Sequence, residues 1–496
     1  MPVAEPVIVI GGGLGGLSAA IHLRLAGRDV LLLEQGPRLG GKCNRLSWEG
    51  YHFDTGPSLL TMPFVVEGIF KAAGKRLEDY LELRRLDPAC RYFFPDWSRF
   101  DAPGTLAGWD QAVADQFPGD FEGWKRFRRT NEKLWEVSFP VFLDAPLDGH
   151  TPTRVPYGKA LGALGALFPR RMDSVLRSHF SDPRLRQIFQ RYATYNGSDP
   201  ARTPSTFNVI HHAEASFGSW HPVGGIYRLV EALERLCRES GVEIRTGVGV
   251  DRLEFSSGGK ELRAVALADG DRLECDQAVI NQDAVRALAG ELFREHPRAE
   301  AWKNRFNRRE TSVSGYVLLV ALDRQVEALE CHNIFFTQDY DREFREIFEE
   351  GRPLSAPTLY LHNPGKVDSS LAPAGKSAWF ILVNAPPLDR CPEWPEDYDS
   401  QVLELLGSRL RSHGIPFEKE WVVWSESRGP RYFESEYNAW HGSLYGLSSN
   451  TLRDAFFRVR NRGPVAGVAF AGGSAHPGGG IPLVLQSGRF AAKTLA

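Results

Sequence analysis

Two glycine-rich segments, near opposite ends of the 496-residue chain, have residue types and a spacing suited to binding a nucleotide. In the first, Gly11, Gly13 and Gly16 follow the apolar run 7–10 and precede the apolar-periodic segment 17–25. This order predicts a strand, a tight turn and a helix. Gly11 permits the turn, Gly13 lets the backbone approach a pyrophosphate, and Gly16 lets the helix pack closely on the sheet. The helix N-terminus would then direct unpaired N–H groups at the phosphates.

A second apolar run, 30–33, ends in Glu34, where a carboxylate can hold the hydroxyls of a ribose. The next segment, 38–42, reads Arg-Leu-Gly-Gly-Lys and resembles the Arg-x-Gly-Gly continuation of flavoproteins of the glutathione-reductase and amine-oxidase type. That resemblance implies FAD, and the alternative is a Rossmann-like sheet that has lost its nucleotide. The cofactor-binding residues expected in this block are Gly11, Gly13, Leu14, Gly15, Gly16, Glu34, Gln35, Arg38, Gly40, Gly41 and Lys42.

The C-terminal block repeats the order of strand, glycine loop and helix. The apolar run 468–471 precedes a glycine-rich loop, and Pro482 suits the start of a helix over 483–495. Bare amides in this loop could reach a flat ligand and stabilise the negative charge of a reduced flavin. His476 is the titratable group of the loop and the candidate general base, although it could instead anchor its own loop. The expected cofactor contacts are Gly472, Gly473, Gly479, Gly480 and Ile481.

Three segments between these blocks are also predicted to meet the cofactor. The turn-forming cluster 53–58 resembles the segment over the flavin in carotenoid-desaturase-like enzymes, although most such loops do nothing chemical. A strand near 250 is matched to one whose backbone meets the adenine in flavoproteins with two dinucleotide domains. The buried run 277–280 ends in polar residues at a sheet edge, and a plain structural strand is the alternative for each. The residues concerned are Asp54, Gly56, Pro57, Val250 and Asn281.

Composition excludes several classes of function. Lys plus Arg number 59 and Asp plus Glu 62, so the formal charge of −3 gives no general attraction to nucleic acid or to an anionic membrane. The six cysteines form no CxxC pair, which indicates neither a metal site nor a disulfide framework and suits a reducing cytoplasm. No apolar run reaches the roughly 18 residues that span a bilayer, and no signal peptide precedes the first predicted strand.

The predicted fold class is α/β, with a Rossmann-like FAD-binding domain of the glutathione-reductase/amine-oxidase type and an interleaved α+β substrate domain. The FAD-binding domain is expected at 1–70, 216–292 and 456–496, and the substrate domain at 71–215 and 293–455. Within the latter, the sequence of the segment 157–171 predicts a short apolar helix with basic flanks. Such a helix could lie in a membrane interface or wall a lipid tunnel, and its apolar face is too short to decide between them.

Over essentially its whole length the chain resembles the bacterial-type phytoene desaturase family of carotenoid desaturases and related oxidases. The match rests on the blocks 11–42, 220–227 and 476–482, with a similar middle segment at 331–336. Phytoene desaturases tend toward His-Pro-Gly-Ala-Gly, whereas this chain has three glycines after Pro477, as in the later-acting branch. The resemblance therefore implies a desaturase acting on an already conjugated, hydroxylated or methoxylated carotenoid, of the hydroxyneurosporene or 3,4-desaturase type.

For such an enzyme the resemblance implies hydride loss to flavin N5 and proton loss from the neighbouring carbon of a long polyene. The protein then needs mainly an apolar tunnel and close positioning. The implied partners are a long apolar carotenoid, a membrane surface that the cytoplasmic protein contacts peripherally, and quinone or oxygen as electron acceptor. The rival interpretations are a terminal-methyl oxygenase or oxidase of the same family, a flavin-free prenyl-lipid carrier like the GDP-dissociation inhibitors, and a generic amine oxidase.

Overall fold

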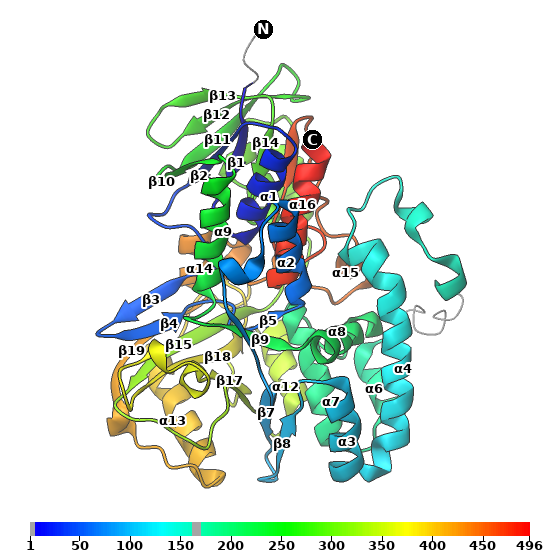
Figure 1. Ribbon diagram of the computed structural model, residues 1–496, viewed down its shortest axis with the longest axis vertical. Coiled ribbons are helices and arrows are strands. Elements are labelled where there is room, and N and C mark those ends of the chain that lie inside the picture. Colours follow the sequence, from blue (N-terminus) through cyan, green and yellow to red (C-terminus); the bar gives the residue numbers. More distant parts are fainter. Residues whose placement is uncertain (1–4, 161–169) are drawn as a thin grey trace.

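The structure, a computed structural model, describes residues 5–160 and 170–496 and has two lobes along its longest axis (Figure 1). The upper lobe in this view is built on a parallel five-stranded sheet with the strand order β10-β2-β1-β14-β20. Its strands come from four distant parts of the chain: β1 (Val7–Ile10), β2 (Val30–Glu34), β10 (Glu243–Thr246), β14 (Ala278–Ile280) and β20 (Val468–Phe470).

Both faces of this sheet are covered. Alternate side chains of β1 enter two cores: Val7 and Val9 pack with the helices on one face, and Ile8 and Ile10 pack with the elements on the other. The helices of the first face are α1 (Leu14–Leu25), α2 (Pro63–Ala72), α9 (Tyr227–Glu239) and α16 (Ile481–Leu495). The second face holds the antiparallel strands β11 (Val250–Phe255), β12 (Leu262–Leu267) and β13 (Arg272–Glu274), with α10 (Ala284–Ala289) and α11 (Ala299–Phe306).

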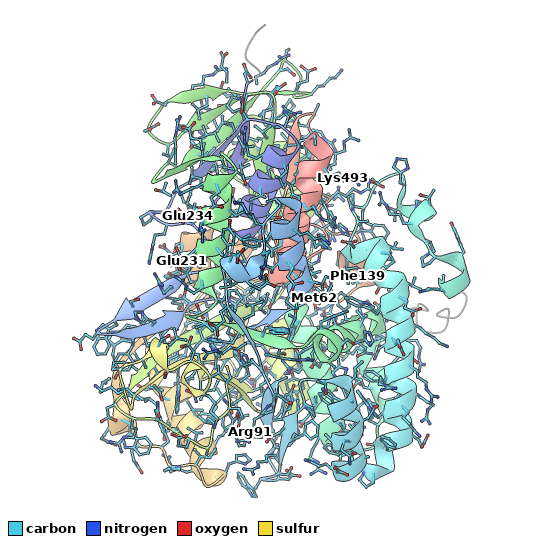
Figure 2. All side chains as sticks on the ribbon, viewed as in Figure 1. Met62, Arg91, Phe139, Glu231, Glu234 and Lys493 are labelled. Carbon is cyan, nitrogen blue, oxygen red and sulfur yellow. The ribbon has the colours of Figure 1, made fainter. Side chains whose placement is uncertain are left out.

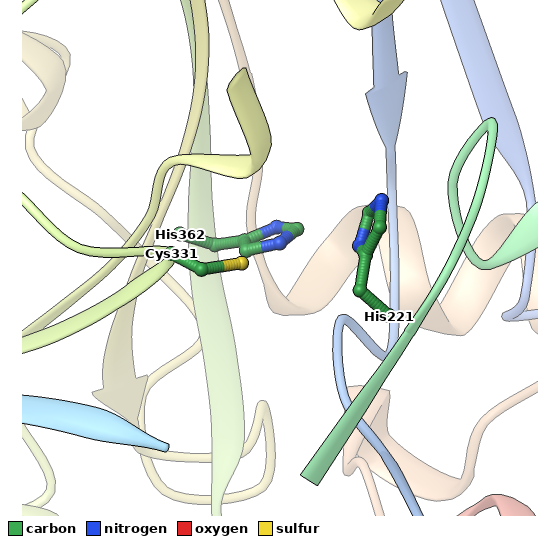
Figure 3. Close-up of side chains that lie close together, drawn as sticks. All are labelled: His221, Cys331 and His362. Atoms are coloured by element: carbon green, nitrogen blue, oxygen red, sulfur yellow. The ribbon is translucent and has the colours of Figure 1, made fainter. Parts of the chain in front are cut away.

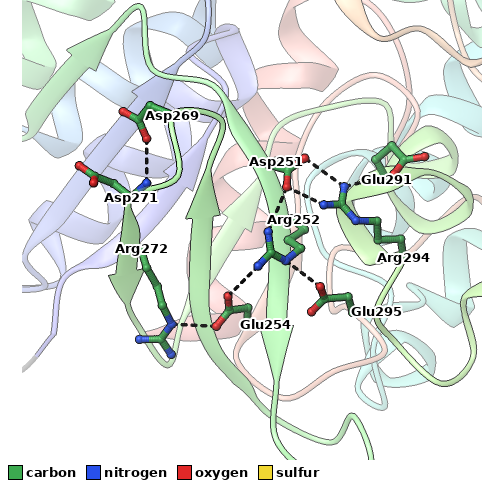
Figure 4. Close-up of polar contacts among 9 residues, drawn as sticks. All are labelled: Asp251, Arg252, Glu254, Asp269, Asp271, Arg272, Glu291, Arg294 and Glu295. Atoms are coloured by element: carbon green, nitrogen blue, oxygen red, sulfur yellow. Dashed lines mark hydrogen bonds and ion pairs between the residues drawn. The ribbon is translucent and has the colours of Figure 1, made fainter.

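Ion pairs connect β11 to the segment that follows α10 (Figure 4). Arg294 Nη2 lies 2.6 Å from Asp251 Oδ2, and Arg252 Nε lies 2.7 Å from Glu295 Oε1. All four side chains are partly exposed, so each pair contributes about 0–1 kcal/mol. The pairs hold the start of β11 beside the cavity described below.

The lower lobe contains a seven-stranded sheet in the order β19-β15-β18-β17-β16-β7-β8. The one parallel pair among these strands, β16 with β7, joins two distant stretches of chain, and the other neighbours are antiparallel. Helix α13 (Tyr398–Ser412) packs on one face. The strands are β7 (Cys90–Phe93), β8 (Arg99–Ala102), β15 (Ser314–Leu322), β16 (His332–Phe335), β17 (Leu359–His362), β18 (Ser377–Ala385) and β19 (Val422–Arg428).

An aromatic-rich helical layer lies beside this sheet, and Figure 2 shows side chains filling both lobes, with Arg91 in the lower and Lys493 in the upper. The helices of the aromatic-rich layer are α3 (Leu106–Gln116), α4 (Phe121–Ser138), α6 (Met172–His179), α7 (Pro183–Gln190), α8 (Val209–Phe217) and α12 (Tyr340–Arg345). The remaining α-helices and β-strands of the described residues are β3 (Arg45–Trp48), β4 (Tyr51–Asp54), β5 (Leu60–Thr61), β6 (Leu83–Arg85), β9 (Ser219–Pro222), α14 (Pro430–Tyr437) and α15 (Leu452–Phe456).

No helix within the described residues has the length and apolar character that crossing a membrane requires. Most of the predicted apolar helix at 157–171, namely 161–169, lies outside the described residues. The predicted membrane contact of this segment therefore stays a prediction. The predicted domain limits stay predictions as well.

Candidate cofactor and substrate site

A cavity of about 1520 Å³ runs between the two lobes. On the side of the parallel sheet it is lined by residues at the carboxyl ends of β1, β2 and β14 and by the start of α16. On the other side it is lined by residues of β15, β16, β17 and β18. Because ligands of open α/β sheets bind beyond the carboxyl ends of the parallel strands, the first side has the position of a nucleotide site.

The first glycine turn leads directly from β1 into α1. Gly11 has a φ of +97°, a conformation that favours glycine. A Cβ at Gly12 would lie 2.4 Å from Leu39 Cδ2, so this position has no room for a side chain. Gly13 is the N-cap residue of α1 and offers no side-chain acceptor to the first helical amides. Those amides face the site without a side-chain cap, as an anion-binding helix terminus does.

Glu34 and the second glycine turn complete this part of the cradle. The two carboxylate oxygens of Glu34 accept hydrogen bonds from the amides of Gly12 at 2.7 Å and Gly36 at 2.8 Å. The amide of Gly40 donates to the carbonyl oxygen of Gly12 at 2.9 Å, and Gly13 and Gly40 form an isolated parallel bridge. The two turns are therefore fixed against each other, with Glu34 held at the edge of the cavity.

Asn281 fills the space beneath the first glycine turn. Its Nδ2 donates to the carbonyl oxygen of Ala471 at 3.1 Å, which ties β14 to the C-terminal block. A Cβ at Gly13 would lie 2.8 Å from Asn281 Oδ1, and a Cβ at Gly15 would lie 2.7 Å from its Nδ2. Asn281 Oδ1 is buried and has no hydrogen-bond partner in the described parts of the chain. Such an unsatisfied acceptor at a ligand cavity calls for a donor, which a ligand can supply.

The C-terminal glycine loop supplies the opposite wall. Gly480 is the N-cap residue of α16, with a φ of +95° and no side-chain cap. A Cβ at Gly480 would meet no protein atom within 4 Å, so this glycine borders open space. At Gly479 a Cβ would instead lie 2.5 Å from Tyr445 Cδ1, which keeps that position a glycine. The uncapped helix termini, the free Asn281 acceptor and this open wall fit a dinucleotide cofactor.

Most of the residues predicted from the sequence border this cavity. They are Gly11, Gly13, Leu14, Glu34, Gln35, Arg38, Gly40, Gly41, Lys42, Gly56, Pro57, Val250, Asn281, Gly472, Gly473, Gly479, Gly480 and Ile481. Lys42 is partly buried, and its Nζ donates to the carbonyl oxygen of Leu444 at 3.0 Å. Burial lowers the pKa of Lys42.

Three predicted cofactor residues, Gly15, Gly16 and Asp54, lie outside the cavity lining, and their contact with a cofactor stays a prediction. A Cβ at Gly16 would come within 2.1 Å of the carbonyl oxygen of Gly11, and Gly15 is pressed against Asn281, so both glycines serve packing. The carboxylate of Asp54 accepts hydrogen bonds from the amides of Ile226 at 2.8 Å and Tyr227 at 3.1 Å. Asp54 therefore holds the start of α9, and burial raises its pKa to about 6.

His476, the predicted general base, does not line the cavity. Its side chain is buried outside the cavity lining and donates from Nε2 to the carbonyl oxygen of Ala145 at 2.9 Å. Its ring stacks on Phe490, with ring centroids 5.9 Å apart. Burial lowers the pKa of His476 to about 4, so the imidazole is neutral at neutral pH. These contacts favour the alternative stated above, in which His476 anchors its loop.

The lower-lobe part of the cavity contains polar groups that the sequence motifs did not identify. His332 on β16 lines this part of the cavity, and its Nδ1 lies 2.7 Å from the hydroxyl oxygen of Tyr360. The same hydroxyl oxygen lies 2.5 Å from Ser58 Oγ. His332 Nε2 is buried and unpartnered in the described parts of the chain. Arg191 and Glu214 also line the cavity, although both are buried. Arg191 and Glu214 carry no local motif, and His332 lies in the segment 331–336 that resembles the family, although nothing in that segment marks its side chain. Only the tertiary structure brings these residues to one cavity.

Three further buried side chains lie close together outside the cavity lining: His221, Cys331 and His362 (Figure 3). Their ligand atoms lie within 4.8 Å of one another, and His221 Nε2 is 3.3 Å from Asp368 Oδ2. In a tetrahedral zinc site, neighbouring ligand atoms lie about 3.5 Å apart, which is closer than the 4.8 Å limit within which these three atoms fall. The thiol of Cys331 would also have to ionise to bind a metal, and burial raises its pKa. We assign no metal to this cluster.

Comparison with known proteins identifies relatives along the whole chain. The family model described as flavin containing amine oxidoreductase matches residues 14–496. Among solved structures, cyclohexylamine oxidase from Brevibacterium oxydans is similar, with a TM-score of 0.63, 17% identity and 99% of each chain covered. This likeness concerns the fold, and it confirms the predicted fold class.

Two curated proteins are similar in sequence. One is 4,4'-diapolycopene oxygenase of a Methylomonas species, 34% identical over 489 residues, which cover 98% of this chain and 97% of the relative. The other is carotenoid 3,4-desaturase of Haloarcula japonica, 34% identical over 507 residues, which cover 99% of this chain and 98% of the relative. Both names agree with the predicted resemblance.

Proposed function

The chain belongs to the family of flavin-containing amine oxidoreductases, and from this premise we propose that it is an FAD-dependent carotenoid desaturase. The observation that carries the proposal is the continuous cavity, which joins a dinucleotide cradle to a pocket in a second lobe. The relative named carotenoid 3,4-desaturase, whose alignment covers 99% of this chain, supports this choice of substrate and reaction.

The cradle residues support FAD as the cofactor. The amides at the start of α1 would meet the pyrophosphate, Glu34 the ribose of the adenosine half, and the loop before α16 the isoalloxazine. When bound, FAD supplies hydride acceptance at N5. The chain's own part is to hold one C–H bond of the polyene at that position and to keep water out.

We propose that Nε2 of His332 is the base that accepts the proton lost from the neighbouring carbon of the polyene. The hydrogen-bond chain is satisfied when His332 Nδ1 donates to the hydroxyl of Tyr360 and that hydroxyl donates to Ser58 Oγ, which leaves the Nε2 lone pair free. Burial lowers the pKa of His332 to about 3, so the ring is neutral at neutral pH. A weak base suffices here, because the conjugated polyene spreads the developing allylic cation and makes the proton acidic.

The second candidate is terminal-methyl oxygenation, which is favoured by the relative named 4,4'-diapolycopene oxygenase at 34% identity. The two reactions can share the cradle and differ in the fate of the substrate. A flavin-free lipid carrier is disfavoured, because the uncapped start of α1 and the glycine turns keep a site with no other evident use.

Product analysis separates the two candidates. We expect the flavin-loaded protein, supplied with lycopene, neurosporene or their 1-hydroxy derivatives and a quinone under nitrogen, to yield products with two hydrogens fewer and a longer chromophore. Chromatography with mass spectrometry measures this change. Conversion that requires oxygen and adds an oxygen atom would favour the oxygenase, and a purified protein that never retains flavin would contradict both.

We also propose that the protein draws its substrate from a membrane through the segment 157–171. The proposal is supported by the lipid-soluble substrate class and by the basic flanks of this apolar segment. Leu164→Glu with Leu167→Glu should lower binding to anionic liposomes at least about tenfold, as measured by sedimentation of the folded, flavin-loaded protein. Ser412→Glu is the control, on an exposed part of α13. Unchanged liposome binding by the double variant would place the contact elsewhere.

A further inference from the structure

A buried charged cluster lies in the wall of the lower-lobe cavity, and we call its members Arg191, Glu214 and Tyr195 the Arg191 cluster. All three residues line the cavity. Arg191 and Glu214 have only 10% and 8% of their side-chain surface exposed, and Arg191 Nη2 lies 3.9 Å from Glu214 Oε1. They belong to separate elements, because Arg191 and Tyr195 lie in the 3₁₀ segment Arg191–Asn196 and Glu214 lies in α8.

Tyrosines hold the cluster in place. Arg191 donates to the hydroxyls of Tyr92 at 2.7 Å and Tyr195 at 3.0 Å. Glu214 accepts from the hydroxyls of Tyr192 at 2.7 Å and Tyr195 at 2.9 Å. The guanidinium also lies over the rings of Tyr92, Tyr192 and Tyr195, at 4.7–5.4 Å from their centroids. The cluster is therefore pre-organised, and Arg191 Nε still has no acceptor among the described residues.

An ion pair in this position is costly for an enzyme whose ligand is a hydrocarbon. Removing two charges from water costs several kcal/mol per ion, and well-packed apolar residues of similar volume often serve the fold as well or better. A polyene lying against Arg191 and Glu214 would remove their remaining water without offering a hydrogen bond. The cost is offset when the ligand itself presents a polar group at this wall.

We propose that the Arg191 cluster binds a hydroxyl group carried by the polyene substrate. The inference rests on the proposed function and specifies the substrate class of the same cavity. A hydroxyl can accept a hydrogen bond from Arg191 and donate one to Glu214, so it satisfies both charges together. A methyl ether can only accept, and a carboxylate is repelled by Glu214, so both should bind less tightly than the alcohol.

Binding measurements with matched polyenes test this order of affinity. The probes are acyclic carotenoids of one chromophore length that end in a hydrocarbon, a hydroxyl, a methoxy or a carboxylate group, titrated in detergent micelles into the flavin-loaded protein while flavin fluorescence is followed. We expect the alcohol to bind at least about tenfold more tightly than the hydrocarbon, as a charge-assisted hydrogen bond provides. The ether and the carboxylate should bind more weakly than the alcohol.

The decisive variant is the double change Arg191→Met with Glu214→Leu, because it removes both charges together and leaves no unpaired ion to unfold the protein. This variant should bind the hydrocarbon as tightly as the wild type or more tightly, and should lose the preference for the alcohol. The matched control is Arg309→Met with Asp454→Leu, another largely buried ion pair, which lies outside the cavity lining. It should keep the preference of the wild type.

The outcomes separate this inference from the proposed function. Equal affinities of the wild type for alcohol and hydrocarbon would overturn the inference and leave the carotenoid desaturase proposal intact. A preference for the alcohol that survives in the folded double variant would also overturn it, because another group would then recognise the hydroxyl. Binding of no polyene by the flavin-loaded wild type would instead contradict the proposed function.

Discussion

The Gly13→Leu protein should be purified without FAD. A Cβ at Gly13 would lie 2.8 Å from Asn281 Oδ1, and a leucine side chain at this cavity-lining position would compete with the pyrophosphate for the space at the start of α1. We expect FAD occupancy, measured by absorbance after release with acid, to fall from near one per chain to background. Activity on any polyene should disappear with it.

The control for this change is Gly68→Leu in α2, an exposed glycine at which a Cβ would meet no atom within 4 Å. It should keep full FAD occupancy. Circular dichroism and thermal unfolding of the flavin-free Gly13→Leu protein show whether the fold survives. Gly13→Ala, whose small Cβ meets mainly the side-chain amide of Asn281, should retain part of the FAD. A folded Gly13→Leu protein that carries a full complement of FAD would disprove the cradle.

The cradle could be predicted from the sequence because its requirements are local. A positive φ at Gly11 and an uncapped helix start after Gly13 are properties of the turn itself. A strand, a glycine turn and a helix encode them within some fifteen positions, and the C-terminal loop into α16 follows the same logic. The parallel sheet follows in turn, since buried apolar runs must pair with one another.

The polar wall of the substrate cavity could not be predicted, because its contacts connect distant segments. Arg191 donates to Tyr92, 99 positions away in the chain, and Glu214 faces Arg191 from a different helix. His332 meets Tyr360 only because β16 and β17 pair in one particular register. No spacing rule links such positions, so tertiary packing alone brings them to one cavity.

His476 shows the opposite limit, where the sequence predicts the backbone position but not the direction of the side chain. The glycines around His476 line the cavity, yet its imidazole lies in the protein interior against the Ala145 carbonyl. Glycine loops present backbone, so the neighbouring side chain can point either toward the ligand or away from it. Here the buried hydrogen bond at 2.9 Å and the Phe490 ring determine that direction.

We therefore expect His476→Ala to weaken the fold and leave the chemistry intact. The change removes a buried hydrogen bond and a packed ring, which should lower the free energy of unfolding by about 2–4 kcal/mol. Flavin reduction by the polyene in the folded fraction, followed by anaerobic rapid mixing, should proceed at the wild-type rate. His332→Phe is the counterpart and should slow the same step at least about a hundredfold, the lower range for a lost acid–base group. A slow step in folded His476→Ala, with an unaffected His332→Phe, would reverse this assignment.

The pH dependence of stability provides an independent check on His476. Because the pKa of His476 is about 4 in the folded protein and near 6.5 when unfolded, the unfolded chain binds the proton more readily between these values. This contribution to stability is complete above pH 6.5 and is lost as the pH falls toward 4, by about 2 kcal/mol at pH 5. His476→Gln keeps an N–H donor for the Ala145 carbonyl and cannot take up a proton. Urea unfolding at pH 7 and pH 5 should therefore show a smaller loss of stability for His476→Gln than for the wild type, and an equal loss would mean that the imidazole is exposed to solvent in the folded state.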